Sequence, residues 1–286
     1  MTTSISVVMN TLNEESNIPY ALRSVHTWVD EIIVVDMHSD DRTREIAEEY
    51  GARVYLHDRM GYADPAREFA LAKATSDWIL ILDADELIPR RLAGRLLDIA
   101  TAGEADVVSI ARLNYLLGKP FVGTGWGPTQ DHHERYFKRG WVEARSNIHS
   151  FLQAREGARI VRLPAEEGLA MVHFSYLDTS HFLERLNRYT SIEAQEALER
   201  GERSTIPRAV RRGAREWWQR YVAGRGYRDG WRGFYLSAFM VLYRIAVQVK
   251  LKELADLGGR ATIQAGYHRE AERILAEYGE PPDRGE

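Results

Sequence analysis

Three carboxylates, Asp83, Asp85 and Glu86, lie within four positions directly after the apolar run W-I-L-I-L. Five bulky residues in succession predict a short strand that is buried on both faces. Pro89 is typical of a first helical turn, so the acids belong to the loop at the carboxyl end of this strand, where open α/β sheets bind ligands. Clustered carboxylates repel one another unless a cation lies between them, and oxygen ligands suit Mg²⁺ or Mn²⁺. This spacing indicates a divalent cation that carries a phosphorylated ligand, with a solvated acidic loop as the alternative.

The elements that must position this loop alternate between strands and helices. Apolar runs predict four more strands, at residues 5–9, 31–36, 53–57 and 105–111, and helical spacing predicts helices between them. Strands that are continuous apolar runs favour a parallel sheet covered on both faces. Right-handed crossovers then place the ends of three strands on one edge. Those three ends carry Asn13 and Glu14, then Asp36, then Asp83 with Asp85.

This edge suits a single nucleotide. No G-x-G-x-x-G follows the first strand, which argues against a dinucleotide fold. The first two loops offer acceptors to a base and a ribose, while the third holds a diphosphate through the cation. Asp36 is a good partner for a pyrimidine N–H, and its alternative role is to cap the next helix. Glu14 has the alternative of favouring the first turn of its own helix.

Composition narrows the compartment in which the protein works. The chain of 286 residues contains no cysteine, which excludes disulfides, thiolate zinc sites and cysteine nucleophiles. The first strand begins almost at Met1, so we expect no signal peptide. No uncharged run reaches the ~20 residues that a membrane span requires. We therefore expect a cytoplasmic protein, peripheral at most on the inner face of the membrane.

The C-terminal third changes in character. Residues 203–252 hold twelve Arg or Lys against only Glu216 and Asp229, although the whole chain has a formal charge of −4. These cations are interleaved with Trp and Tyr and precede an apolar stretch at residues 234–249, which is typical of an interfacial contact with an anionic membrane. A nucleic-acid partner is disfavoured because no fold signature for one accompanies the charge. The other alternative is a helical subdomain whose arginines pair with the sheet domain or with a second subunit.

Three segments, in order, carry a family resemblance: V-V-M-N-T-L-N-E-E, I-I-V-V-D-M-H-S-D-D-R-T and A-L-A-K-A-T-S-D-W-I-L-I-L-D-A-D-E. Shorter matches follow at residues 114–119, 131–139, 148–149 and 172–176. As a set, over residues 4–195, they resemble the inverting family 2 glycosyltransferases of GT-A fold, and more narrowly the lipopolysaccharide-core β-glucosyltransferase-like branch. The chain departs from that family at residues 36–43, at Glu68, where Asn is common, and at His149-Ser150, where members have His-Glu.

The resemblance implies a nucleotide-sugar donor and a role for each loop. Three residues of the first loop, Thr11, Asn13 and Glu14, would lie near the ribose and base. Asp36 would accept from the base, and Arg67 would lie by the base or the diphosphate. Asp85 would coordinate Mn²⁺ or Mg²⁺ directly, with Asp83 oriented to the ribose or to a metal-bound water. His173 would complete the metal site; its alternative is a structural hydrogen bond.

Inverting transfer needs one base for the acceptor hydroxyl, opposite the group that neutralises the leaving diphosphate. Asp131 is our candidate base, because it follows a Gly/Trp-rich loop and matches the acidic position that the family has four residues before an arginine. Glu134 is the second candidate. Asp131 has the alternative of a surface salt bridge with Arg135 or Lys138. Trp126 in the loop is suited to stacking on a sugar ring or to anchoring a core.

The sequence therefore predicts an α/β protein: a GT-A domain with a Rossmann-like mixed sheet over residues 1–175, followed by a helical region over residues 176–286. The predicted function is metal-dependent transfer of a sugar, with inversion, from a nucleoside diphosphate to a glycan or lipid-linked acceptor. A nucleotidyltransferase is the first alternative, but it would favour a Gly-, Arg- or Lys-rich loop after the first strand, and residues 10–17 contain none. A catalytically silent binding or scaffold protein is the second, favoured by His149-Ser150. The C-terminal tail, residues 281–286, is predicted to be disordered.

Overall fold

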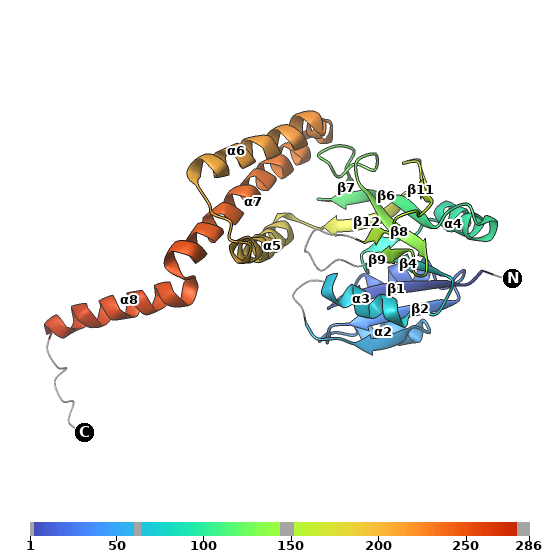
Figure 1. Ribbon diagram of the computed structural model, residues 1–286, viewed down its shortest axis with the longest axis horizontal. Coiled ribbons are helices and arrows are strands. Elements are labelled where there is room, and N and C mark those ends of the chain that lie inside the picture. The colour runs from blue at the N-terminus through green and yellow to red at the C-terminus, as the bar shows by residue number, and fades with distance from the viewer. Residues whose placement is uncertain (1–2, 60–63, 144–151, 279–286) are drawn as a thin grey trace, which may run out of the picture.

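The structure, a computed structural model, describes residues 3–59, 64–143 and 152–278. Figure 1 shows a sheet covered by helices, from which a set of long helices extends to the C-terminus. The strands are β1 Ile5–Thr11, β2 Glu31–Asp36, β3 Arg53–Leu56, β4 Trp78–Ile81, β5 Glu86–Leu87, β6 Val107–Leu116, β7 Lys119–Pro120, β8 His132–Lys138, β9 Val142–Glu143, β10 Gln153–Ala154, β11 Ile160–Arg162 and β12 Met171–Tyr176. The helices of the sheet part are α1 Ile18–Arg23, α2 Thr43–Glu49, α3 Asp64–Lys73 and α4 Arg90–Ala102.

The N-terminal half of the main sheet is parallel, as its apolar runs predicted. The strand order is β3-β2-β1-β4-β8-β6-β12-β5, and β1 pairs in parallel with both β2 and β4. The register places Thr11 opposite Asp36, at the carboxyl ends of β1 and β2. The loops after β1, β2 and β4 consequently meet at one edge of the sheet, which confirms the predicted grouping.

The other half of the sheet is mixed, which agrees with the predicted Rossmann-like mixed sheet; the parallel pairing that the apolar runs favoured ends at β4. β8 runs antiparallel between β4 and β6, whereas β6 pairs in parallel with β11 and β12. The connection from β6 to β8 contains only β7 and turns, and antiparallel neighbours need no crossover helix. This inserted strand carries residues 132–138 to the same edge as the carboxylate loop.

Alternation along the strands divides the core between the two faces of the sheet. Val7 and Leu80 pack with α1 and α4 in one buried cluster, while Val8 and Ile79 pack with α3 in another. Strands that are buried on both faces are mainly apolar, which is why β1, β2 and β4 lack the polar alternation of an exposed sheet, although Ser6 of β1 is buried as well. The carboxylate loop therefore follows a strand that is packed on both faces.

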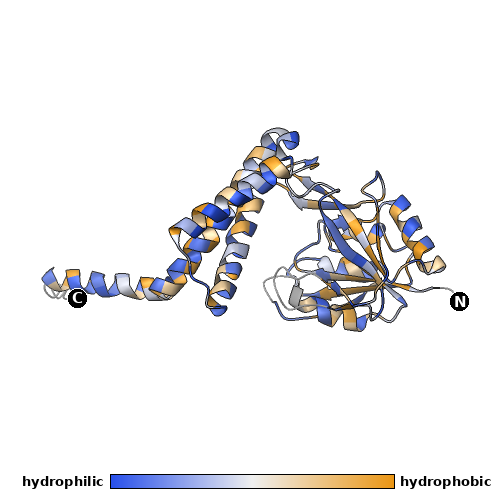
Figure 2. Cartoon of the chain, turned by 45° about the horizontal axis from the view of Figure 1, so that its top comes forward, coloured by the Kyte–Doolittle hydropathy of each residue, from blue (hydrophilic) through white to orange (hydrophobic). Residues whose placement is uncertain are grey.

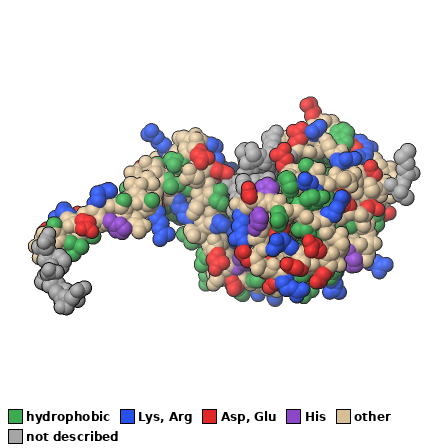
Figure 3. Space-filling model, turned by 90° about the horizontal axis from the view of Figure 1, so that it is seen from below, with side chains coloured by type: hydrophobic (Ala, Val, Ile, Leu, Met, Phe, Trp, Pro, Cys, Tyr) green, Lys and Arg blue, Asp and Glu red, His purple; other side chains and the backbone are tan. Residues whose placement is uncertain are grey.

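Long helices follow β12. They are α5 Thr179–Glu199, α6 Ile206–Trp217, α7 Gly230–Leu257 and α8 Arg260–Leu275, with short turns η1 Trp218–Ala223, η2 Gly226–Asp229 and η3 Ala276–Tyr278. Asp178 caps α5 by accepting from the backbone N–H of His181 at 2.8 Å. Both α5 and α6 pack against α7, while α8 stands apart from the sheet part in two views (Figures 1 and 3). β12 ends at Tyr176, beside the predicted boundary at 175/176, which stays a prediction.

The segment Gly226–Leu257 is long and apolar enough to cross a membrane by length and composition, the one such helix in the described part of the chain. Its most apolar window is 39% buried within the protein, because Leu236, Met240 and Val247 pack against α5. Figure 2 shows hydrophilic residues interrupting the apolar ones along the C-terminal helices. Length and composition are weak support for a span, since the core helix of a soluble domain meets the same criteria.

Candidate active site

A cavity of about 610 Å³ lies between the carboxyl edge of the sheet and the helices α5 and α7. The sheet contributes charged and polar side chains to its wall, and the helices contribute mainly aromatic and apolar ones. Six of the predicted site residues line it: Glu14, Arg67, Asp83, Asp85, Asp131 and His173. The four others, Thr11, Asn13, Asp36 and Glu134, lie outside its wall.

Asp36 is fully buried and holds the loop after β2 in place. Its Oδ2 accepts from Thr11 Oγ1 at 3.0 Å, and its Oδ1 accepts from the backbone N–H of Ser39 at 2.8 Å. The N-cap of α2 is Arg42, so the capping alternative for Asp36 is wrong. Asn13, in a left-handed conformation at φ 57°, accepts from the backbone N–H of Asp40 at 2.8 Å. These contacts join the first two loops into one rigid rim, and contact of either residue with a base or ribose stays a prediction.

Glu14 faces the cavity from that rim. Burial raises the pKa of its carboxyl, and the charges of Asp85 and Asp83 raise it further, against a hydrogen bond from Asn17 that lowers it. Carboxylates from the first and third loops are thus close enough to repel one another. The expectation that the loops crowd negative charge at one point is met by the structure.

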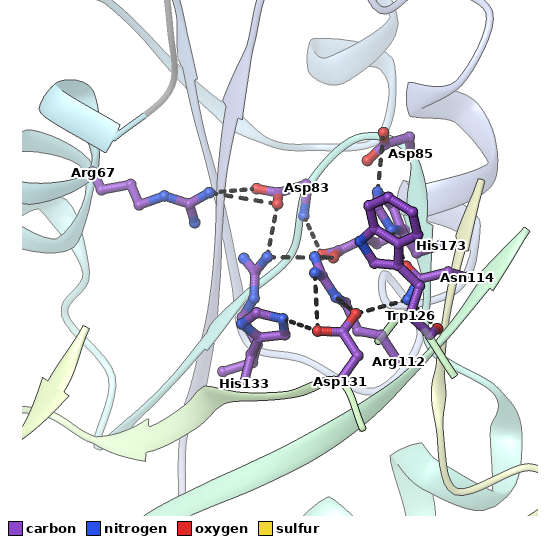
Figure 4. Close-up of polar contacts among 11 residues, drawn as sticks. Arg67, Asp83, Asp85, Arg112, Asn114, Trp126, Asp131, His133 and His173 are labelled. Atoms are coloured by element: carbon purple, nitrogen blue, oxygen red, sulfur yellow. Dashed lines mark hydrogen bonds and ion pairs between the residues drawn. The ribbon is translucent and has the colours of Figure 1, made fainter. Parts of the chain in front are cut away.

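Arginines supply part of the positive charge between the acids, which sequence reasoning missed. Asp83 accepts from Arg67 Nη2 at 3.1 Å (Figure 4). It also accepts from Arg135 Nη2 at 2.9 Å. Glu86 is fully buried; its Oε1 lies 3.3 Å from Arg135 Nη2, and its Oε2 accepts from the backbone N–H of Asp83 at 2.9 Å. Burial opposes ionisation of Asp83, but the charges of Arg135 and Arg67 hold its pKa far below the ordinary value. Asp83 and Glu86 are therefore satisfied by protein groups, and Asp85 is the carboxylate of the three that remains for a metal.

Asp85 and His173 present two acceptors to the same point. Asn114 Nδ2 donates to Trp126 O at 2.8 Å and to Asp131 Oδ2 at 2.7 Å, which fixes Asn114 Oδ1 as an acceptor. His173 Nδ1 lies 2.6 Å from that oxygen and must donate to it, so in the neutral ring Nε2 carries a lone pair. This Nε2 lies 3.5 Å from Asp85 Oδ2 (Figure 4). Two acceptors facing each other fit a cation between them.

This donor set fits a metal that arrives with its substrate. Among the described residues no group of three or more His, Cys, Asp and Glu side chains is arranged to hold a metal by itself. Mg²⁺ and Mn²⁺ sites of transferases take one or two protein ligands and complete the shell with phosphate oxygens and water. Asp85 and His173 meet that requirement, and the hydrogen bond from His173 to Asn114 orients the ring as metal-binding histidines require.

Asp131 lies in the cavity wall with four donors around its carboxylate. Oδ2 accepts from Arg112 Nε at 3.0 Å and from Asn114 Nδ2, while Oδ1 lies 2.7 Å from His133 Nε2 and 3.4 Å from Arg112 Nη2. Burial raises its pKa, but the hydrogen bond from His133 and the charge of Arg112 outweigh burial and lower the pKa well below the ordinary value. The salt-bridge alternative named the wrong arginine: the partner is Arg112 on β6.

Glu134 does not belong to this site. Successive side chains of a strand point to opposite faces, so His133 and Arg135 line the cavity and Glu134 does not. Its Oε2 accepts instead from the backbone N–H of Ala154, at 3.2 Å. Glu134 as the second candidate base is therefore wrong. His132 lies on that other face as well, beside the carbonyl of Leu163, as expected for adjacent histidines on a strand.

Trp126 joins the cavity to the C-terminal helices. Arg220 of η1 covers its ring, with Cζ 4.3 Å from the ring centre, and Arg220 Nη1 donates to Thr124 O at 2.8 Å. Trp126 also lines the cavity, so one face is held by a cation while the side chain still borders the open volume. His149 and Ser150, the departure from the family pattern, lie outside the described residues.

Comparison with known proteins decides the class. A family model described as Glycosyl transferase family 2 matches residues 6–170. The chain belongs to this family. It is a glycosyltransferase of GT-A fold, which confirms the family that the motifs indicated and excludes the nucleotidyltransferase.

Two relatives cover almost the whole chain. An uncharacterized glycosyltransferase of Rickettsia bellii is 25% identical over 262 residues, 89% of this chain and 88% of that protein. The lipopolysaccharide core biosynthesis glycosyltransferase LpsC of Rhizobium meliloti is 22% identical over 271 residues, 91% of this chain and 96% of that protein. Among solved structures, the chain is similar to glucosyl-3-phosphoglycerate synthase from Mycobacterium tuberculosis in complex with Mn²⁺, uridine-diphosphate-glucose and phosphoglyceric acid, with 29% identity and a TM-score of 0.33 over 39% of this chain and 44% of that one.

Proposed function

We propose that this glycosyltransferase is metal-dependent and inverting, and that it moves a sugar from a nucleoside-diphosphate sugar to a hydroxyl of a glycan or lipid-linked acceptor. The observation that carries the proposal is the pair of acceptors, Asp85 Oδ2 and His173 Nε2, 3.5 Å apart at the carboxyl edge of the sheet. A bound Mg²⁺ or Mn²⁺ would supply positive charge to the departing diphosphate at that point. The remaining steps belong to side chains of this chain.

The donor would lie across the rim that the first two loops form. Asn13 and Asp36 hold those loops rigid, so the base and ribose meet preorganised backbone and side-chain groups. Arg67 Nη2 lies 3.1 Å from Asp83, beside the point where the diphosphate would enter. Asp83, ionised and held by Arg135, is placed to accept from a ribose hydroxyl or a metal-bound water.

Asp131 is the proposed base on the acceptor side. In an inverting transfer the acceptor hydroxyl attacks the anomeric carbon while a base takes its proton. Since four donors surround the carboxylate of Asp131, an acceptor hydroxyl must displace one of them, and the contact from Arg112 Nη2, at 3.4 Å, is the longest. Hydrogen bonds in the free enzyme commonly rearrange in this way when substrate binds.

The test is a panel of nucleotide sugars screened by thermal shift with and without Mn²⁺, since a ligand that binds only the folded state raises its melting temperature. We expect one donor to stabilise the protein in the presence of Mn²⁺, and Asp85→Asn to lose that stabilisation. Asp131→Asn should keep donor binding and lose transfer by about 10²–10⁴-fold, the usual contribution of a general base. If no donor binds, or if Asp85→Asn binds it as well as the wild type does, the proposal is wrong.

The acceptor is proposed to be presented at an anionic membrane surface. The segment that runs from η1 through η2 to the start of α7, three elements in mutual contact, carries the exposed aromatic side chains Trp218 (61% exposed) and Trp231 (58%) and the exposed cations Arg225 and Arg228. We call these four residues the aromatic–basic patch. Aromatic rings with neighbouring arginines bind the headgroup region of anionic bilayers without spanning them.

Flotation with phosphatidylglycerol vesicles tests this surface. The protein should float at low salt and be released at high salt, because screening weakens the electrostatic part of binding. Replacement of Trp218 and Trp231 by Ser should abolish flotation. Replacement of Tyr267 by Ser should not, although this aromatic side chain on α8 is even more exposed (73%). Failure of the wild type to float at low salt would remove the membrane proposal and leave the transfer reaction untouched.

A further inference from the structure

One face of α5 forms part of the wall of the cavity that Asp85 and His173, the proposed metal-binding pair, also line. Phe182, Leu186 and Tyr189 recur at helical spacing along this face and line the cavity. Arg185 falls within the same stripe and lines the cavity as well. A long cation at a position where the stripe would otherwise be apolar requires a reason, because transfer of a charge out of water is costly unless something compensates it.

Arg185 differs from the other two helical arginines of this cavity. Arg220 Nε and Arg244 Nε donate to the two oxygens of the buried Glu216, at 2.5 and 2.9 Å, so their charge is met within the helices. Among the residues that the structure describes, Arg185 makes no hydrogen bond and no ion pair. Its recorded contact is with the ring of Tyr176, whose centre lies 5.5 Å from Cζ. The guanidinium keeps its five N–H donors for another partner.

The position of Arg185 indicates that this partner would lie near the metal-binding pair. Tyr176 follows His173 by three residues on β12, a distance of roughly 10 Å along an extended strand. Asp85 is fastened to the same strand, because its carbonyl accepts from the backbone N–H of Phe174 at 2.9 Å. The charge of Arg185 is also felt at Glu14, where it lowers the pKa of the carboxyl in opposition to Asp85. An anion between these loops and α5 lies within reach of an arginine side chain.

We propose that Arg185 binds the phosphate oxygens of the donor and holds the negative charge that develops on the leaving diphosphate. In the reaction the bond between the anomeric carbon and the phosphate oxygen breaks, and its electron pair stays on that oxygen. The acceptor oxygen bonds to the anomeric carbon and its proton passes to Asp131. Arg185 exchanges no proton, since a guanidinium stays charged, and its planar fork suits two phosphate oxygens at once. This inference rests on the proposed function.

The test compares Arg185→Met with Arg188→Met. Arg188 lies three residues further along α5 and covers the ring of Tyr189 at 5.1 Å, as Arg185 covers that of Tyr176. It is exposed and does not line the cavity, whereas Arg185 is partly buried in the cavity wall. Calorimetric titration with UDP and GDP, with and without Mn²⁺, should show diphosphate affinity reduced by tenfold or more for Arg185→Met and unchanged for Arg188→Met. For Arg185→Met, the affinity for UMP or GMP should fall less than the affinity for UDP or GDP. In turnover measurements of this variant, kcat should fall by a larger factor than KM rises. Arg185→Lys, which keeps the charge without the fork, should lie between.

Each outcome decides the inference. Equal diphosphate affinity of Arg185→Met and the wild type overturns it while the proposed function stands. Equal losses for the monophosphate and the diphosphate also overturn it, because they indicate a structural role. If Arg185→Met fails to fold, Arg185→Lys supplies the comparison. If the wild type binds neither UDP nor GDP with Mn²⁺, the proposed function fails first and this inference fails with it.

Discussion

Glu86 does not itself line the cavity, yet we predict that its replacement by glutamine both destabilises the protein and weakens donor binding. The side chain is fully buried, and both of its oxygens accept. Oε2 accepts from the backbone N–H of Asp83, and Oε1 faces Arg135 at 3.3 Å and Arg112 at 3.5 Å. A glutamine has the same shape but a single acceptor oxygen, so its amide N–H₂ must face either the Asp83 N–H or the arginines.

The size of the destabilisation depends on which partners the two arginines retain in the Glu86→Gln variant. Removing one member of a buried ion pair costs about 3–5 kcal/mol, because the remaining charge is left without compensation. Here Arg135 retains Asp83 at 2.9 Å and Arg112 retains Asp131 at 3.0 Å, which places Glu86→Gln at the lower end, about 3 kcal/mol. That is a large part of the 5–15 kcal/mol by which a typical domain is stable, and corresponds to a fall in melting temperature of roughly 6–12 °C.

Urea unfolding at pH 7 and titration with UDP and Mn²⁺ measure the two effects. Glu104→Gln is the matched control: Glu104 lies 2.7 Å from Arg95, but both side chains are over a third exposed, and such pairs contribute about 0–1 kcal/mol. A destabilisation of Glu86→Gln no larger than that of Glu104→Gln would refute the reasoning. Unchanged UDP affinity would refute the prediction that Glu86 positions the loop that carries Asp83.

Three further outcomes are expected. Since burial raises the pKa of Glu14, the folded protein binds the carboxyl proton more tightly than the unfolded chain does. Glu14→Gln should therefore stabilise the free enzyme at pH 7, as measured by urea unfolding. This gain should vanish as the pH falls below the ordinary carboxyl pKa. Arg220→Met should expose the amides around Trp126 to hydrogen exchange and cost about 2–3 kcal/mol, because a charged hydrogen bond and a cation–π contact are lost together. In urea unfolding, Gly233→Ala should destabilise the protein by about 1–3 kcal/mol or more, since its Cβ would lie 1.9 Å from the carbonyl oxygen of Gly226. Gly94→Ala on α4, which has open space around it, should stabilise the protein by up to about 1 kcal/mol.

Elements buried on both faces were predictable from the sequence. β1, β2 and β4 are rich in apolar residues because both of their faces are buried, and such a run can be recognised without knowledge of its partners. Their order on the sheet then follows from crossover handedness, which brought Glu14 and Asp85 to one edge.

The arginine partners were not predictable, because they depend on strand register. The alternative role of Asp131 was a salt bridge with Arg135 or Lys138, yet the register of β8 on β6 places Ala111 opposite His132 and so brings Arg112 to Asp131. A one-residue change of register exchanges the two faces of a strand. This also explains the error at Glu134, which sits beside cavity residues in sequence and on the opposite side of the strand in space.

The basic C-terminal segment shows why one composition supported two interpretations. Arg220 and Arg244 pair with Glu216 inside the helical region, and Arg232 donates to the carbonyl of Leu117, so part of the segment fastens helices to one another and to the sheet. Arg225 and Arg228 are exposed beside exposed aromatic rings. Charge that is already paired within the protein contributes little to attraction by a surface, whereas exposed charge contributes about 1 kcal/mol per residue near an anionic bilayer. The salt dependence of flotation should therefore follow the second group and be insensitive to Arg244→Met, even though that variant loses stability. A membrane response carried equally by both groups would mean that the helices open when they meet the bilayer.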